Sequence, residues 1–161
     1  MAEFLADEAA EARTGDHLEL KLWLRLLACS TLIEKRVRSN FRREFGVTLP
    51  RFDLMAQLDR APEGLTMGEL SNRLMVSAGN ITGLIDRLVG EGLVSREPSP
   101  SDRRAQHVRL TAEGKTQFDR MTPAHAEWVR QMLRDGNRKN MKQIFELLGD
   151  LKVTLERGGG R

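Results

Sequence analysis

The sequence of 161 residues contains a single cysteine, Cys29, and no tyrosine. One cysteine excludes an internal disulfide framework and is typical of proteins in a reducing cytoplasm, where we expect this chain to act. No apolar run approaches the roughly 18 residues that a membrane-spanning helix requires. The N-terminal stretch is acidic and has no basic segment, so we expect no secretory signal.

Patterns typical of catalysis and metal binding are also missing. The three histidines, His17, His107 and His125, are scattered, and no Cys/His cluster has zinc-site spacing. The sequence has no glycine-rich phosphate loop, no nucleophile signature and no paired catalytic carboxylates. We therefore expect no metal, no cofactor and no enzymatic activity.

The charges are distributed unevenly along the chain. Residues 1–20 hold six acidic side chains and one basic one, whereas the remainder has a net charge of +8. A basic body suits an anionic partner such as nucleic acid. The apolar fraction of 40% is sufficient for a buried core, and the length suits one domain with helical extensions.

Apolar periodicity predicts a mostly helical chain. A helix over residues 17–45 has apolar side chains at multiples of three and four residues, and Gly46 is positioned to end it. Its first half is apolar on more than one face, which favours a position between a subunit core and a dimer interface. Cys29 lies in that half, and we expect its thiol to be buried and unreactive. A second helix is expected over residues 48–60, with Thr48 as its cap.

Two short helices joined by a tight turn are expected next. Thr66 and Glu69 have the T-x-x-E spacing of a capping box, and Ser77 is placed to cap the following helix. So short a junction is typical of a helix-turn-helix arrangement. The polar face of the second helix has small and amide side chains that can approach base edges in a DNA groove.

A hairpin follows, because L-V-S-R-E and Q-H-V-R-L both alternate apolar and polar residues. The turn between them ends in Arg103 and Arg104, which repel one another and contribute nothing to a core. Such a pair suits a phosphate backbone or a narrow minor groove, and Asp102 can orient the guanidinium of Arg104.

Apolar residues spaced three and four apart in the last part of the chain predict two helices with coiled-coil-like apolar seams. Thr111 caps the first of them, and Asn137 is placed to cap the second. No other domain is available for these seams to pack on. They therefore predict a dimer interface, built together with the helix over residues 17–45.

These elements together resemble the MarR (multiple antibiotic resistance regulator) family of bacterial transcription regulators. The most specific segments are V-S-A-G-N-I-T-G-L-I-D-R-L-V-G-E-G-L-V-S-R and S-D-R-R-A-Q-H-V-R-L-T-A-E-G. The resemblance implies a mainly α fold with a small β-hairpin, namely a winged helix-turn-helix with N- and C-terminal helical dimerisation regions. It also implies a homodimer that binds a palindromic operator in double-stranded DNA, usually represses, and is released by a small aromatic or anionic effector.

The resemblance implies roles for individual residues. Arg104 would enter the minor groove, held by Asp102 and adjacent to Arg103, whereas Gly83 replaces the larger polar or basic residue of many relatives. Implied contacts to the major groove and its phosphates are Ser77, Ala78, Asn80, Thr82 and Arg87.

In the family, the effector binds between the DNA-binding lobe and the dimerisation helices. The implied lining residues here are Trp23, Leu26, Leu27, Ser30, Met55, His107 and Trp128. The arginine-rich end of the first helix resembles members that respond to hydroxycinnamoyl-coenzyme A thioesters in aromatic compound catabolism. Its candidate phosphate-binding residues are Arg36, Arg38, Arg42 and Arg43.

The expected organisation has four parts. These are a flexible arm (1–16), a dimerisation helix (17–47), a winged helix-turn-helix domain (48–115) and C-terminal dimerisation helices (116–161). Two alternative functions are open at this point. The chain is a redox-sensing regulator that uses Cys29, or it is an architectural DNA-binding protein that needs no effector.

Overall fold

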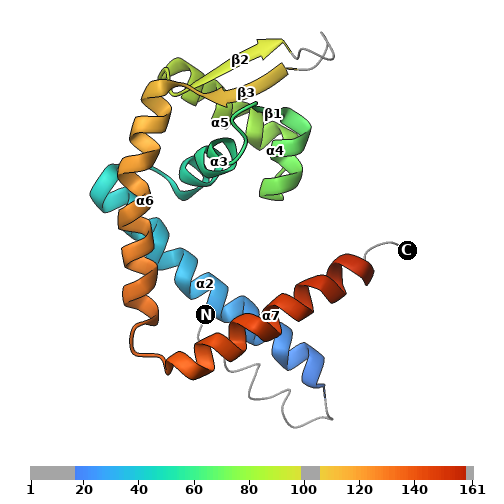
Figure 1. The fold of residues 1–161 in the computed structure, drawn as a ribbon. Helices are drawn as coiled ribbons and strands as arrows, with labels where there is room; N and C mark the ends of the chain where they lie inside the picture. Colours follow the sequence, from blue (N-terminus) through green and yellow to red (C-terminus); the bar gives the residue numbers. More distant parts are fainter. Residues whose placement is uncertain (1–16, 99–105, 159–161) are drawn as a thin grey trace. The chain divides into compact units, whose positions relative to one another are not determined.

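A computed structural model describes residues 17–98 and 106–158 of the chain (Figure 1). The chain divides into two compact units, one ending at Ala126 and the other beginning at Glu127. The elements are α2 (Leu18–Phe45), α3 (Leu49–Asp59), β1 (Leu65–Thr66), α4 (Met67–Leu74), α5 (Ala78–Gly90), β2 (Val94–Pro98), β3 (Gln106–Leu110), α6 (Ala112–Leu133) and α7 (Arg138–Gly158).

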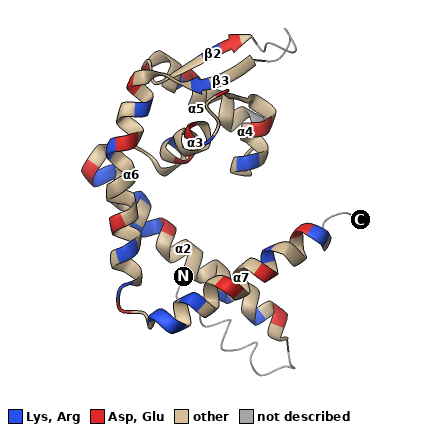
Figure 2. Ribbon diagram, viewed as in Figure 1, with Lys and Arg blue, Asp and Glu red and all other residues tan. Residues whose placement is uncertain are grey.

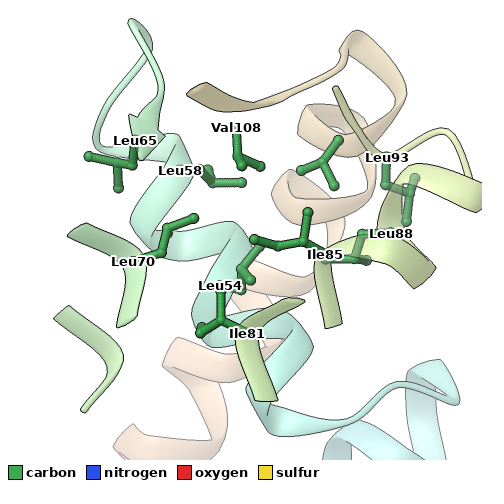
Figure 3. Packing of buried hydrophobic residues seen from close by; sticks show 10 residues of the cluster. Leu54, Leu58, Leu65, Leu70, Ile81, Ile85, Leu88, Leu93 and Val108 are labelled. Atoms are coloured by element: carbon green, nitrogen blue, oxygen red, sulfur yellow. The ribbon is translucent and has the colours of Figure 1, made fainter. Parts of the chain in front are cut away.

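The core of the first unit is an apolar cluster supplied by α3, α4, α5 and the strands (Figure 3). Each member is at most 3% exposed. Burying one such side chain contributes about 1.5–3 kcal/mol, so the cluster is the main source of stability in this unit. Its members are Leu54, Leu58, Leu65, Leu70, Ile81, Ile85, Leu88, Leu93, Val94 and Val108.

The sheet confirms the predicted hairpin and adds a strand that the sequence did not reveal. Its strand order is β1-β3-β2, and both pairings are antiparallel. Strands β2 and β3 pair from Val94 with Leu110 to Pro98 with Gln106. The added strand β1 has two residues, and its Leu65 pairs with Val108. This pairing joins the start of α4 to the wing.

Local sequence signals at several helix ends are confirmed. Thr66 and Glu69 form the predicted capping box at α4. Gly46 adopts a left-handed conformation with φ of 66° and ends α2. Thr48 and Ser77 precede α3 and α5 in extended conformations, but neither side chain makes a capping hydrogen bond.

The second half of α2 is fixed to α3 and α6 by a cluster of aromatic rings. The Phe41 and Phe52 ring centroids are 4.5 Å apart, and the His125 ring lies 5.7 Å from Phe41 and 4.9 Å from Phe52. Burial in this cluster lowers the pKa of the His125 imidazole. The ring contacts determine where the arginines of α2 lie relative to α3.

The first half of α2 and the whole of α7 leave large apolar side chains exposed. Leu18 and Trp23 of α2 are 66% and 58% exposed, and α7 buries none of its residues. The prediction that Cys29 is buried is wrong for the single chain, in which its thiol is exposed. Leu27 and Leu32, two of the apolar neighbours on which that prediction rested, are exposed as well. None of the described helices is long and apolar enough to cross a membrane.

The junction of β3 and α6 requires a glycine. The Thr111 hydroxyl accepts a hydrogen bond from the Gly114 N–H at 3.0 Å and donates one to the Gly92 carbonyl at 2.7 Å. A β-carbon at Gly114 would lie 2.0 Å from the carbonyl oxygen of Leu93. The start of α6 therefore packs directly on the backbone between α5 and β2.

Replacing Gly114 with alanine should lower the free energy of unfolding by about 2 kcal/mol, because an added methyl group forces the backbone apart. Urea denaturation would measure the change. Gly83→Ala is the matched control, since a β-carbon at that helical position meets no atom within 4 Å. The control should be neutral or stabilise by up to about 1 kcal/mol. Equal losses in both variants would contradict the packing argument.

Candidate nucleic-acid interface and effector cavity

The turn between α4 and α5 determines the direction in which α5 leaves the core. Met75 has a left-handed backbone with φ of 53°, and its N–H donates to the Asn72 carbonyl. The Ser71 hydroxyl donates to the Val76 carbonyl at 2.6 Å. These bonds close the last turn of α4, so α5 begins in a fixed orientation.

The outer surface of α5 carries the predicted DNA-contacting side chains. Ser77, Asn80, Thr82 and Arg87 are exposed, and Ala78 is the first residue of the helix. The Arg87 Nε donates to the carbonyl of Gly83 at 3.3 Å, one turn earlier. An exposed helix with small and amide side chains near its N-terminus has the dimensions to enter a major groove.

One ion pair joins the wing, which consists of β2 and β3, to α5. Arg96 of β2 pairs with Asp86 of α5 at 2.6 Å. Arg109 of β3 lies 3.8 Å from the Glu63 carboxylate and 4.0 Å from that of Glu97, so these contacts are weaker. The predicted tip residues Asp102, Arg103 and Arg104 lie outside the described residues.

A cavity of about 550 Å³ lies between α2, α3 and the α4–α5 turn, with one side of α5 as a wall. Its volume is within the 300–1,000 Å³ typical of small-molecule sites. Charged and polar groups line part of it and apolar side chains the rest. The lining residues are Glu34, Arg38, Arg42, Thr48, Pro50, Asp53, Leu74, Val76, Asn80, Ile81, Leu84 and Arg87.

The charged groups of the cavity interact with one another, and these interactions affect the pKa of Asp53. Glu34 and Arg38 form an ion pair one turn apart on α2, where Figure 2 marks the basic and acidic positions. The pKa of Asp53 is raised from 3.8 to about 6. Burial is the main cause and the carboxylate of Glu34 the second, whereas the guanidinium of Arg38 acts in the opposite direction. A carboxyl group with a pKa this far from its usual value is typical of a functional site.

Two of the predicted effector-contacting residues, Arg38 and Arg42, line this cavity. Met55 is fully buried in α3, His107 lies in β3, and Trp128 belongs to the second unit. The other predicted positions lie on α2 and do not line the cavity. They are Trp23, Leu26, Leu27, Ser30, Arg36 and Arg43.

Sequence reasoning did not identify the acidic part of the cavity. Asp53 stands between Phe52 and Leu54, which are both buried, and a carboxylate in that position could have indicated an acidic group at the edge of the core. Glu34 gave no such signal, because an acid four residues before Arg38 is common on a solvated helix. Among the residues with described positions, no His, Cys, Asp or Glu cluster could hold a metal ion.

Comparisons with known proteins cover most of the chain. A family model described as MarR family matches residues 45–105. The transcriptional regulator PecS from Dickeya dadantii is 30% identical over 128 residues, which cover 78% of this chain and 76% of PecS.

Solved structures extend the similarity. A MarR family transcriptional regulator from Silicibacter pomeroyi is 32% identical, with a TM-score of 0.73 over 85% of this chain and 94% of that one. Sco3205, a MarR family regulator from Streptomyces coelicolor that was crystallised in complex with DNA, is 26% identical. Its TM-score is 0.73 over 86% of this chain and 88% of that one.

The raised pKa of Asp53 predicts a pH-dependent effect of Asp53→Asn. The pKa of about 6 in the folded protein exceeds the ordinary 3.8. Ionisation of Asp53 therefore lowers the free energy of unfolding as the pH rises from about 4 through about 6. At pH 7.5 the variant should therefore be more stable by about 1 kcal/mol, a figure already reduced for solvent screening of the half-buried group. At pH 4 the gain should disappear.

Urea denaturation at the two pH values would measure this difference. Asp150→Asn, which changes an exposed carboxylate of α7, is the control and should have little effect at either pH. A gain of the same size for Asp53→Asn at pH 4 and pH 7.5 would show that its charge is not the cause.

Proposed function

This chain belongs to the MarR family of DNA-binding transcription regulators, and on that premise we propose that a small aromatic anion releases it from a palindromic operator. The family binds DNA as dimers, and we expect this chain to act as a homodimer that represses while it occupies the operator. It is a regulator and not an enzyme.

The observation that carries the effector proposal is the position of the cavity. One wall comes from α2, the predicted dimerisation helix, and another from α5, the predicted recognition helix. A ligand bound there contacts both elements at once. Ligand binding can shift DNA affinity only if the ligand interacts differently with the DNA-bound and free states, and contact with α5 supplies that difference.

The lining favours a particular class of ligand. Arg38, Arg42 and Arg87 supply guanidinium groups that suit a carboxylate, and Leu74, Val76 and Leu84 supply an apolar surface for a ring. A finer proposal is a hydroxycinnamoyl-coenzyme A thioester from aromatic compound catabolism. Its acyl group would occupy the cavity, and its phosphates would reach the exposed arginines Arg36 and Arg43 of α2.

Titration of the protein–DNA complex with 4-hydroxycinnamate and with 4-hydroxycinnamoyl-coenzyme A would test the effector proposal. The DNA would be a site that the protein itself selects from a random library. Release by either compound at micromolar concentration supports an aromatic anion as effector. Release by the free acid alone would exclude the thioester proposal. Release by neither compound would exclude aromatic anions as the effector class.

Exposure of the Cys29 thiol favours a second candidate, a redox-sensing regulator. A thiol must be accessible before a peroxide can oxidise it. Loss of DNA binding after mild peroxide treatment, prevented by Cys29→Ser, would support this function. Unchanged DNA binding in peroxide would exclude it.

Arg104→Ala should weaken binding to the selected DNA about tenfold, because each subunit loses one guanidinium at the minor groove. The slope of log affinity against log salt should become shallower by roughly one per subunit. Fluorescence anisotropy at several salt concentrations would measure both quantities. The control is Arg157→Ala in the last turn of α7, for which the slope should not change. An unchanged slope for Arg104→Ala would contradict the wing assignment.

Leu148→Lys should raise the dissociation constant of the homodimer about 100-fold or more. An unpaired charge in an apolar interface makes the free energy of association less favourable by several kcal/mol. Leu148 lies in the predicted seam of α7 and is 40% exposed in the single chain. Sedimentation equilibrium would measure dimerisation. Gln143→Lys places the same side chain on the exposed polar face of α7 and should leave the dimer intact. Dimers of equal stability in both variants would exclude this seam from the interface.

A further inference from the structure

One stripe of α5 belongs to two proposed binding surfaces. Asn80 and Arg87 are predicted DNA contacts, and both also line the cavity. They lie seven residues apart with Leu84 between them, a spacing that places all three on one side of a helix. This side is the flank of α5, next to the buried face of Ile81 and Leu88.

We propose that the effector and DNA compete directly for Arg87 and Asn80, so that bound effector blocks DNA binding without any change in the spacing of the two recognition helices. This inference rests on the effector function proposed above. It assigns to Arg87 two exclusive partners, a phosphate of the DNA and the carboxylate of the effector.

The ion pairs of the neighbouring residues explain why an anionic ligand would bind Arg87. Arg38 is already paired with Glu34 and also faces Asp53. In the part of the chain that the structure describes, Arg42 and Arg87 have no carboxylate partner within ion-pair distance. A carboxylate that enters the cavity therefore meets these two guanidinium groups.

Arg87 can serve either partner but not both. Its side chain is exposed, and its Nε is already bonded to the Gly83 carbonyl, which leaves the two terminal nitrogens for an anion. A carboxylate and a phosphate each take such a fork in a bidentate manner. Occupation by one anion therefore removes the same donors from the other.

The test separates competition from a change of dimer geometry. The affinity of the full-length dimer for 4-hydroxycinnamate or its coenzyme A thioester is measured by calorimetry at increasing concentrations of the selected DNA. Competition predicts that the apparent dissociation constant of the probe rises without limit and that native mass spectrometry detects no complex of protein, DNA and probe. A plateau, with a ternary complex, would overturn the inference.

Variants in the absence of DNA provide the second arm. Arg87→Ala should weaken probe binding about tenfold or more, the usual effect of losing a charge-assisted hydrogen bond, and Arg87→Lys should restore part of it. The control is Arg73→Ala, which removes an exposed arginine of α4 that does not line the cavity and should leave probe affinity unchanged.

Failure of this inference can be distinguished from failure of the proposed function. If a probe releases DNA but Arg87→Ala binds the probe as tightly as the wild type, the competition is wrong and the effector function stands. If neither probe binds the wild-type dimer, the effector class itself is wrong, and the inference falls with it.

Discussion

Burial of one face of α5 is the constraint on which the rest of the DNA-binding unit depends. Ile81, Ile85 and Leu88 are at most 1% exposed, enclosed by side chains of α3, α4 and the strands (Figure 3). Turning the helix about its axis would expose these side chains at a cost of about 2 kcal/mol each. The direction of every other side chain of α5 follows from this packing. Asn80 and Arg87 consequently lie on the flank, where the predicted DNA-contacting surface meets the cavity.

The sequence predicted those parts of the fold that depend on neighbouring residues. The capping box of Thr66 and Glu69 and the alternation of the two wing strands are local patterns, and the structure contains both. Strand β1 was missed because two residues are too few to show a period. The cavity was missed in large part because Glu34, Asp53 and Arg87 come from three helices, and no local pattern brings such distant positions together.

The error at Cys29 has a related cause. Apolar neighbours along α2 indicate that a surface is buried in something, but they do not say whether the same chain covers it. Here Val37 and Phe41 in the second half of α2 are buried, whereas Leu18 and Trp23 in its first half remain exposed. The second half of α2 therefore contributes side chains to a buried core, whereas its first half presents apolar side chains on the surface of the single chain. This division is expected of an element that links a DNA-binding unit to a dimer interface.

The charge of the cavity limits the class of the proposed effector more closely than the volume of the cavity does. Three arginines and two acids line it, so with Glu34 and Asp53 both ionised its net charge is +1. A ligand with one negative charge balances this charge, whereas a neutral ring leaves a guanidinium group without an anionic partner. The carboxyl group of Asp53, whose pKa is raised to about 6, makes the cavity more positive as the pH falls. An aliphatic residue in its place would pack without this electrostatic cost, which supports the proposal that the cavity receives a polar ligand.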